Sequence, residues 1–369
     1  MAVTQYTIFP GREVGLDNTS NSALVNPKHL VQLTNCVYDI SGAIVKRRGN
    51  ARSNTTAITT YTNTIQAVAD FWRSNGSLVA PTQKQLCIAN SGTDTENFQR
   101  DVDATSWTAL SGGTDWTGGT GAAATAYGHI TIADIFAVFS DGTNVPHKYD
   151  QTSRTDLGAT AASTPKFAAS TYHLRRLFVG GAVQMADNST AADPDTLYWS
   201  AASDITIWTG EDSNSQPINE GDSDRIVGLS KPLRGDIYIF KGNYHGSVWK
   251  LSGVEGGDFR LAQVVSGVPA VNHKCIITTS NDVFWVSRYG IHSLSATQKY
   301  GDVEEAFISR GVQSTFNSDI LTGSRELEYF THGFYHPYRN QVGWFLNGAS
   351  SRQYVYLYDL ALGQWTIWN

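Results

Sequence analysis

The residues of this chain that could bind a metal are histidines and a cysteine in short polar segments. His332 and His336 are four residues apart, a spacing at which a helix could present two zinc ligands. Their segment, residues 328–335, alternates as a strand does, and four strand residues span about 13 Å. Zinc–nitrogen bonds of about 2 Å cannot bridge that distance, so we expect no metal there. His273 and Cys275 fall on one face of a predicted strand without a second ligand pair, which favours a structural role.

Two acidic segments carry oxygen atoms that calcium could use. They are residues 141–144 and 220–224, both rich in Asp and Gly. A calcium loop needs regularly spaced ligands and a bidentate glutamate further along, and neither segment has that pattern. Turn formation explains both segments, so we expect no bound ion.

Motifs for group transfer are missing from the chain. It contains neither the Gly-x-Ser-x-Gly turn of an acyl-transfer nucleophile nor a phosphate loop ending in Gly-Lys-Ser or Gly-Lys-Thr. Paired acids, Asp101 with Asp103 and Glu304 with Glu305, could hydrolyse glycosides only if they faced each other across a cleft. Spacing within one segment does not predict a facing pair. We therefore predict that the protein is not an enzyme and has no catalytic residue, cofactor or metal.

The basic residues form one dense cluster, residues 46–48. It precedes a Thr- and Asn-rich stretch and has no interleaved aromatic residues, unlike a nucleic-acid patch. The whole chain has 27 Lys and Arg against 33 Asp and Glu, a net charge of −6. General affinity for phosphate backbones requires clustered positive charge, so we expect DNA to be bound weakly, if at all. A salt-bridged or interface role is favoured for the cluster.

The composition favours strands over helices and folding in a reducing compartment. Aromatic residues are plentiful, with 10 Trp, 17 Tyr and 15 Phe, and 34 Gly indicate frequent turns. Cys36, Cys87 and Cys275 lie far apart among apolar neighbours, as buried free thiols do. The first residues lack the pattern of a signal peptide, and no stretch is long enough to span a membrane. We expect synthesis and folding in a cytoplasm.

The clearest local structure is the last stretch, residues 354–369. Tyrosines alternate with Val, Leu and Asp over residues 354–359, the period of two that a strand imposes. Residues 359–363 supply a turn, because Gly363 can adopt a positive φ. Residues 365–368 then begin a second strand, so the stretch predicts a β-hairpin.

Similar units of about 40–60 residues recur roughly six times, which is the range of propeller blades. They cover residues 65–112, 122–158, 166–210, 226–267, a fifth unit from residue 270, and 327–369. The predicted strands are 65–72, 86–89, 98–102 and 107–110; 127–132, 135–139, 146–150 and 155–157; 167–172, 176–179, 197–199 and 205–208; 226–229, 237–240, 247–251 and 259–264; 275–279, 283–286 and 291–294; and 328–335, 342–346 and the final hairpin.

A four-stranded sheet cannot bury both of its faces alone, so such units must stack on their neighbours. We therefore predict an all-β fold, a six-bladed β-propeller formed by a single domain of residues 35–369 after an arm of residues 1–34. A hairpin that turns at Ser41 and Gly42 has no partner in the residues that follow it. We expect its strands, 37–40 or 44–47, to pair with the last unit and so close the ring without free edges.

One segment departs from the β pattern. Asp302 with Glu305 three residues on resembles a capping box, and Ile308, Val312 and Phe316 fall on one helical face. We predict a short helix over residues 303–316. Because this helix and the arm lie outside the repeat, they are our candidates for contacts between subunits.

Three segments resemble a known family. Residues 35–49, NCVYDISGAIVKRRG, are similar to the opening motif N-C-x-x-D-x-x-G-x-[IVL]-x-x-R-x-G of tail proteins from tailed bacteriophages. Residues 229–253, with GDIYIFK and VWKLSG, look like the recurring blade of these proteins, and YDLALGQW at residues 358–365 is similar to their ending. The relatives are the tail nozzle, or tubular tail, proteins and the packaged-DNA stabilisation proteins of short-tailed phages.

The resemblance implies a structural protein of the virion tail, made in the host cytoplasm. Copies of the chain, six in our expectation, would form a ring below the portal and adaptor, and DNA would pass through its channel without sequence-specific binding. A mild negative charge would help DNA slide. This chain is shorter than the long nozzle proteins, so it would lack their large tip domains. The family's pattern assigns no catalytic residue here.

Two other functions fit a propeller. A tail component that binds or cleaves glycans would bind a glycan array or release reducing sugars. A cellular scaffold for peptides is the other, and the phage-like motifs speak against it.

Overall fold

The computed structural model describes residues 16, 34–38, 44–47, 58, 64–73, 82–91, 95–114, 116, 128–158, 160–210, 212–242, 245–254, 258–295, 307–319, 331–347 and 353–368. Contacts between residues divide the chain into two compact units. The first unit combines Met1–Asn50 with Lys274–Asn369, and the second is Ala51–His273. The predicted arm of residues 1–34 and single domain of residues 35–369 stay predictions.

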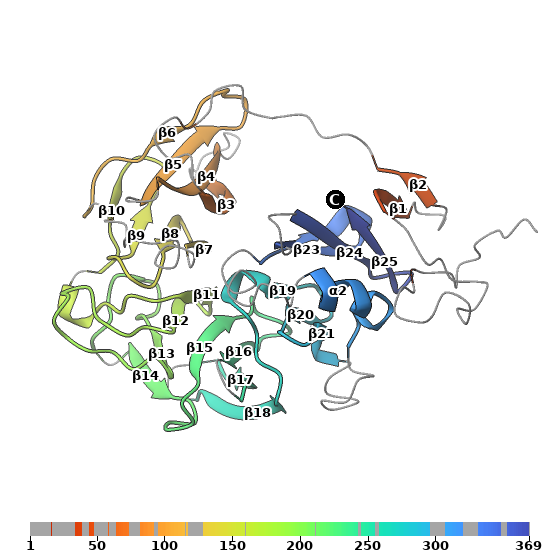
Figure 1. The fold of residues 1–369 in the computed structure, drawn as a ribbon. Helices are drawn as coiled ribbons and strands as arrows, with labels where there is room; N and C mark the ends of the chain where they lie inside the picture. Colours follow the sequence, from red (N-terminus) through yellow and green to blue (C-terminus); the bar gives the residue numbers. More distant parts are fainter. Residues whose placement is uncertain are drawn as a thin grey trace, which may run out of the picture. The chain divides into compact units, whose positions relative to one another are not determined.

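The second unit contains four antiparallel sheets of four strands each, with strands in chain order (Figure 1). The first two sheets comprise β3 (Thr64–Arg73), β4 (Thr82–Asn90), β5 (Thr95–Asp101) and β6 (Thr108–Ala109), then β7 (His129–Ala133), β8 (Phe136–Ser140), β9 (His147–Tyr149) and β10 (Arg154–Asp156). The next two comprise β11 (Ala169–His173), β12 (Arg176–Gly180), β13 (Thr196–Trp199) and β14 (Asn214–Pro217), then β15 (Arg225–Leu229), β16 (Ile237–Gly242), β17 (Ser247–Ser252) and β18 (Arg260–Ser266). The first strands of neighbouring sheets, β3, β7, β11 and β15, lie side by side.

The first unit contains a hairpin and two larger sheets. The hairpin pairs β1 (Cys36–Tyr38) with β2 (Ile44–Lys46), and a three-stranded sheet comprises β19 (Ile277–Thr278), β20 (Val283–Val286) and β21 (Ile291–Ser293). The last sheet comprises β22 (His332–His336), β23 (Gln341–Asn347), β24 (Gln353–Asp359) and β25 (Gln364–Trp368). Short 3₁₀ turns of this unit are η4 (Arg310–Val312) and η5 (Pro337–Arg339), while η1 (Ala161–Ser163) belongs to the second unit and η2 (His273–Cys275) contains the last residue of the second unit and the first two of this one. These sheets confirm the predicted fold class, an all-β, six-bladed β-propeller with a short helix.

A tight hairpin joins β11 to β12 through two residues, Leu174 and Arg175. Both have positive φ, 49° and 59°, so the turn has the twist that matches paired strands. His173 and Arg176 face each other directly across the ends of the two strands. The final hairpin turns as predicted, because Gly363 has φ 66° and the Asp359 carboxylate accepts the N–H groups of the turn.

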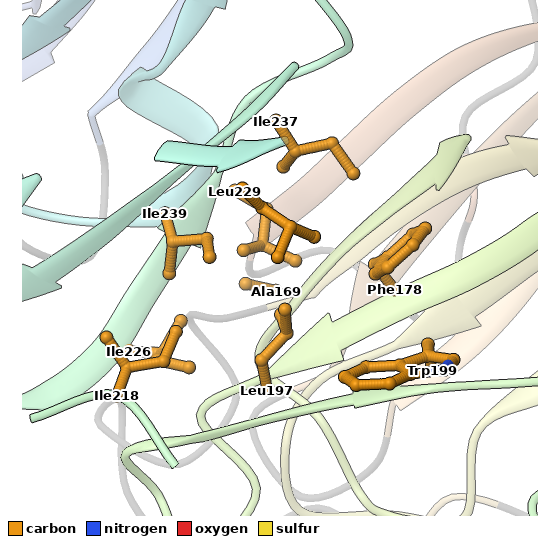
Figure 2. Packing of buried hydrophobic residues seen from close by; sticks show 10 residues of the cluster. Ala169, Phe178, Leu197, Trp199, Ile218, Ile226, Leu229, Ile237 and Ile239 are labelled. Carbon is orange, nitrogen blue, oxygen red and sulfur yellow. The ribbon is translucent and has the colours of Figure 1, made fainter. Parts of the chain in front are cut away.

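Apolar faces of neighbouring sheets interlock within the second unit. One cluster combines Ala169, Phe178 and Leu197 of the third sheet with Ile226 and its neighbours of the fourth (Figure 2). Fully burying each aliphatic side chain contributes about 1.5–3 kcal/mol. The sheets approach so closely that a Cβ on Gly180 would lie 2.7 Å from the Ile226 side chain. Stacking therefore buries the second face that a single sheet leaves open.

The N-terminal segment joins the last sheet, as predicted. Thr34 forms a parallel bridge with Ile367, and the Asn35 N–H donates to the Ile367 carbonyl at 2.9 Å. The prediction placed the pairing within residues 37–40 or 44–47, whereas it occurs just before β1. Strands β1 and β2 pair with each other as the predicted hairpin, with Tyr38 opposite Ile44.

The predicted helix exists but begins later and ends later than residues 303–316. The helix α2 (Gln313–Asp319) follows η4, and Val312 and Phe316 are fully buried on the predicted face. The backbone is not helical at Phe307, because Phe307 forms an antiparallel β-bridge with His292 of β21. The proposed capping box at Asp302 and Glu305 lies outside the described residues.

One predicted strand is wrong, and another is wrong in part. Residues 205–208 form no strand, because the Asp204 carboxylate accepts the Thr206 N–H in a turn and Ile205 is buried beneath the sheet. The fourth strand of that sheet is β14, a polar edge strand. The strand expected over residues 275–279 is only Ile277–Thr278, since η2 occupies the positions before it.

Candidate functional site

The residues that were weighed as metal ligands lie apart. His332 and His336 occupy opposite ends of the strand β22, the separation that the sequence predicted. Burial and the charge of Lys274 lower the pKa of His332 to about 4, so it is neutral near pH 7. Within the described part of the chain, no group of three or more His, Cys, Asp or Glu side chains could hold a metal ion.

His273 and Cys275 belong to the 3₁₀ turn η2, so the prediction of a shared strand face is wrong. The His273 ring accepts the Leu229 N–H at Nδ1, at 3.2 Å. The buried Cys275 thiol donates to the Val286 carbonyl. Both side chains therefore form hydrogen bonds with backbone groups, which is the structural role that was expected.

The two acidic segments use their carboxylates within the protein. Fully buried Asp141 accepts the N–H groups of Thr143 and Asn144 at 2.9 and 2.7 Å. The Asp222 carboxylate accepts a hydrogen bond from the ammonium of the fully buried Lys241 at 2.7 Å. Each carboxylate thus organises a turn, as the sequence indicated.

The remaining candidates from the sequence are the paired acids and the basic cluster, and only some of these residues are described by the structure. Asp101 pairs with Lys84 at 2.6 Å, while Asp103 lies in the turn after β5. Glu304 and Glu305 lie outside the described residues, as does Arg48 of the basic cluster. No facing pair of acids is formed by the members that are described.

Arg47 of the basic cluster contributes to a joint between the hairpin β1–β2 and the strand β25. Its guanidinium lies 5.2 Å from the ring centroid of Trp368. The Trp368 indole N–H donates to the Cys36 carbonyl at 2.8 Å, and the Arg47 N–H donates to the Asn35 carbonyl at 3.0 Å. Asn35 adopts a positive φ of 57°, which Asn tolerates better than most residues. The cluster therefore has the interface role that the sequence favoured, within the chain itself.

A cavity of about 250 Å³ lies between the second and third sheets of the second unit. Its lining comes from the β7–β8 turn, the strands β8, β9 and β11, and the loop after β13, namely Asp134, Phe136, Lys148, Tyr172, Ser203, Asp204, Ile205 and Thr206. Its floor is the apolar cluster that includes Leu177 and Ile205. The Ser203 N–H donates to the Arg175 carbonyl at 2.8 Å, which fixes one wall to the β11–β12 turn.

The cavity combines charged, hydroxyl and aromatic groups. The Lys148 ammonium lies 5.2 Å from the ring centroid of Phe136. A hydrogen bond from the Thr206 hydroxyl lowers the pKa of Asp204, and the positive charge of Lys148 adds to this effect. Burial raises the pKa of Tyr172, with the negative charge of Asp134 adding to it, so the phenol stays protonated near pH 7.

The sequence reasoning missed this cavity, because its walls come from four separate segments of the chain. The sequence did contain one indication of this site. Lys148 is a charged residue in the middle of the short strand β9, between the buried residues His147 and Tyr149. Asp134 and Asp204 look like ordinary turn residues in the sequence. Only the stacking of two sheets brings them together.

No protein-family model matches the chain, and no curated protein matches it. Similar solved structures include a quinonprotein alcohol dehydrogenase-like protein from Bacteroides thetaiotaomicron, with 10% identity, a TM-score of 0.46 and coverage of 81% of this chain. This chain covers 64% of that protein, less than two thirds of its length. The fucose-specific lectin from Aleuria aurantia is 12% identical, with a TM-score of 0.39 and coverage of 83% of this chain and 95% of the lectin. Likenesses at this level carry no information on activity, ligand or partner.

Helices of the described residues are too short or too polar to cross a bilayer.

Proposed function

We propose that this chain is a structural protein of a bacteriophage tail, whose copies form a ring that DNA crosses. The observation that carries the proposal is the joint between the hairpin β1–β2 and β25. It unites the opening segment that resembles tail nozzle proteins, residues 35–49, with the residues that directly follow the similar ending, residues 358–365.

The positions that match the family's motifs have defined structural roles in this joint. Asn35 supplies the positive φ and the N–H that binds Ile367, and Arg47 covers the ring of Trp368. In the ending, Asp359 caps the turn and Gly363 supplies its positive φ. The resemblance thus falls on residues that shape the backbone, which supports common ancestry more than chance matches at variable surface positions would.

One described residue of the arm, Leu16, lies beside the turn that precedes the helix α2 in the first unit. The Leu16 carbonyl oxygen lies 2.6 Å from where a Cβ on Gly311 would be, next to the helix α2. Leu16 is only 5% exposed, so this part of the arm is held against the protein. A surface built from the arm and α2 is the proposed contact between copies.

The charge of the chain agrees with a conduit for DNA. The net charge of −6 disfavours tight binding to phosphates, and a passing duplex must not adhere. We propose that the ring contacts the tail adaptor and portal complex, while DNA is a transient and sequence-independent partner.

Negative-stain electron microscopy and native mass spectrometry test this assembly. The purified chain, alone or mixed with a tail adaptor, is expected to give rings of six copies. A chain that stays monomeric and does not bind the adaptor would contradict the proposal.

A matched pair of variants tests the contact surface. Asn317→Arg adds bulk and charge to an exposed position of α2 and is expected to reduce ring formation. Val254→Arg changes a side chain that is 70% exposed in the second unit and is expected to leave the rings intact. Equal ring yields from both variants would exclude α2 from the contact.

A further inference from the structure

The cavity between the second and third sheets has two aromatic walls that rest on a rigid floor. Phe136 and Tyr172 are half-buried and pack against the same apolar cluster, which contains the fully buried Leu157 and Leu177. Because β7 and β11 lie side by side, the two aromatic residues come from neighbouring sheets whose spacing is fixed by the core. Rigid aromatic walls suit a ligand with a flat apolar face.

The charges around the cavity select against strongly charged ligands. Asp134 and Asp204 contribute two negative charges and Lys148 one positive charge. The net negative charge repels anions, and Lys148 already interacts with the Phe136 ring and with Asp204. Two carboxylates beside an ammonium are a poor site for a metal cation, because hard cations take more oxygen ligands and no competing positive charge. A neutral ligand with several hydroxyl groups fits this arrangement best.

The cavity also offers both the donors and the acceptors that the hydroxyl groups of a ligand need. The carboxylates of Asp134 and Asp204 accept, while the Lys148 ammonium and the Tyr172 phenol donate. Asp134 and Ser203 are exposed at the rim, where they can meet a ligand that enters from solvent. The volume of about 250 Å³ is below the ~300–1,000 Å³ typical of sites for drug-sized ligands. It suits one sugar ring rather than a long oligosaccharide.

We propose that this cavity binds a single neutral pyranose unit, with a C–H face of the sugar on the ring of Phe136 or Tyr172 and its hydroxyl groups on Asp134, Asp204 and Lys148. The proposal involves binding only. It does not depend on the assembly into a tail ring, because all of the cavity residues belong to the second unit of one chain.

Saturation-transfer NMR and calorimetry with a panel of neutral methyl pyranosides test the proposal. At least one glycoside is expected to bind with a Kd on the order of 1 mM, as a ligand of this size allows. Inorganic phosphate serves as the opposing probe and is expected not to bind. A panel without any binder, or phosphate binding that competes with the sugar, would overturn the assignment.

Two charge-removing variants locate the binding. Asp134→Asn keeps a residue that tolerates the φ of 55° at this turn, and Lys148→Met keeps most of the length of the side chain. Each is expected to weaken binding about tenfold, because each removes a hydrogen bond to a charged group. Unchanged affinity in both variants would place the sugar elsewhere.

The control is Asp187→Asn, which changes a partly exposed turn aspartate of the same unit, whose carboxylate accepts hydrogen bonds from the Ser189 and Thr190 N–H groups outside the cavity. It is expected to bind the sugar as the unmodified chain does. The thermal unfolding midpoint of each of the three variants shows whether the variant still folds, so that weaker sugar binding can be distinguished from loss of the folded structure. A parallel loss of affinity in the control would show that the effect is not specific to the cavity.

Discussion

The two compact units stabilise their loops with different chemistry. In the second unit, buried cations bind carbonyl and carboxylate oxygens. Lys241 is fully buried and donates to the Ile218 carbonyl and to Asp222, and Arg154 pairs with Glu96. In the first unit, indole N–H groups donate to backbone carbonyls: Trp344 to Cys275 at 2.9 Å, Trp365 to Ile308 at 2.7 Å and Trp368 to Cys36 at 2.8 Å. The second unit adds one bond of this kind, from Trp116 to the Val145 carbonyl at 2.7 Å, to its buried cations.

This difference has an energetic consequence. A buried charge must keep all of its partners, because a lone charge left in the interior is strongly unfavourable. A neutral indole costs less to bury, and it brings a large apolar surface with it. The second unit should therefore be sensitive to loss of a charge, and the first to loss of an aromatic ring or to a new charge.

The largest effect is expected from Lys241→Met in the second unit. The change removes the ammonium that donates to the Ile218 carbonyl and neutralises Asp222, which keeps only its bonds from Asn219 and Asp224, and should lower the free energy of unfolding by about 3 kcal/mol. Native-state hydrogen exchange should show this loss in peptides of the second unit. Lys250→Met is the control, since its pair with Asp236 at 3.6 Å is partly exposed and should contribute less than about 1 kcal/mol. Similar losses in both variants would contradict the importance of the buried cation.

Acid should affect the first unit before the second. Burial lowers the pKa of His292 from 6.5 to about 3, so below pH 6.5 the unfolded state binds a proton that the folded state does not. Stability is therefore complete above pH 6.5 and falls by about 1.4 kcal/mol per pH unit down to about pH 3. His332 acts in the same direction.

The carboxylates of the second unit titrate in a lower pH range. Although burial opposes it, the Lys241 ammonium lowers the pKa of Asp222 below 3.8, so this contribution is lost only as the pH falls below about 4. Hydrogen exchange at pH 5, corrected for intrinsic rates, should show weaker protection in the first unit only. His292→Asn should remove about half of that pH dependence, because His332 contributes the rest at pH 5. Equal loss of protection in the two units would refute the comparison.

A smaller effect is expected from Trp344→Phe in the first unit. Trp344 is fully buried, and the change removes the donor to the Cys275 carbonyl and leaves a small void, a loss of about 2 kcal/mol. Urea denaturation followed by hydrogen exchange should place the loss in the first unit. Trp72→Phe is the control, because Trp72 is 55% exposed, and its effect should stay within about 0.5 kcal/mol. A Trp344 variant as stable as this control would show that the indole N–H contributes little.

The strands with strong alternation could be predicted from the sequence, and a polar edge strand could not. The predicted strand at residues 283–286 agrees with β20 residue by residue, because its four residues are apolar and all buried. β14 has the sequence NSQP and is mostly exposed, so it lacks an apolar pattern. Residues 205–208 have such a pattern because Ile205 enters the core from a turn.

The structural joint could be predicted in outline and the cavity could not. A hairpin without a local partner implied pairing with the last unit, but the choice of Thr34 over residues 37–40 depends on the local backbone at Asn35. The cavity arises from side chains such as Asp134 and Asp204, whose proximity follows from sheet stacking alone. Local periodicity carries no information on such proximity.

The hydrogen bond between Trp368 and Cys36 also bears on the order of folding. It joins residues 332 positions apart, and closing so long a loop costs about 2 kcal/mol more entropy than closing one a tenth as long. Contacts this distant form slowly, after the local hairpins. We therefore expect the sheets between them to form before the hairpin β1–β2 pairs with β25. During synthesis on the ribosome, this hairpin should remain without its partner strand until β25 has been translated.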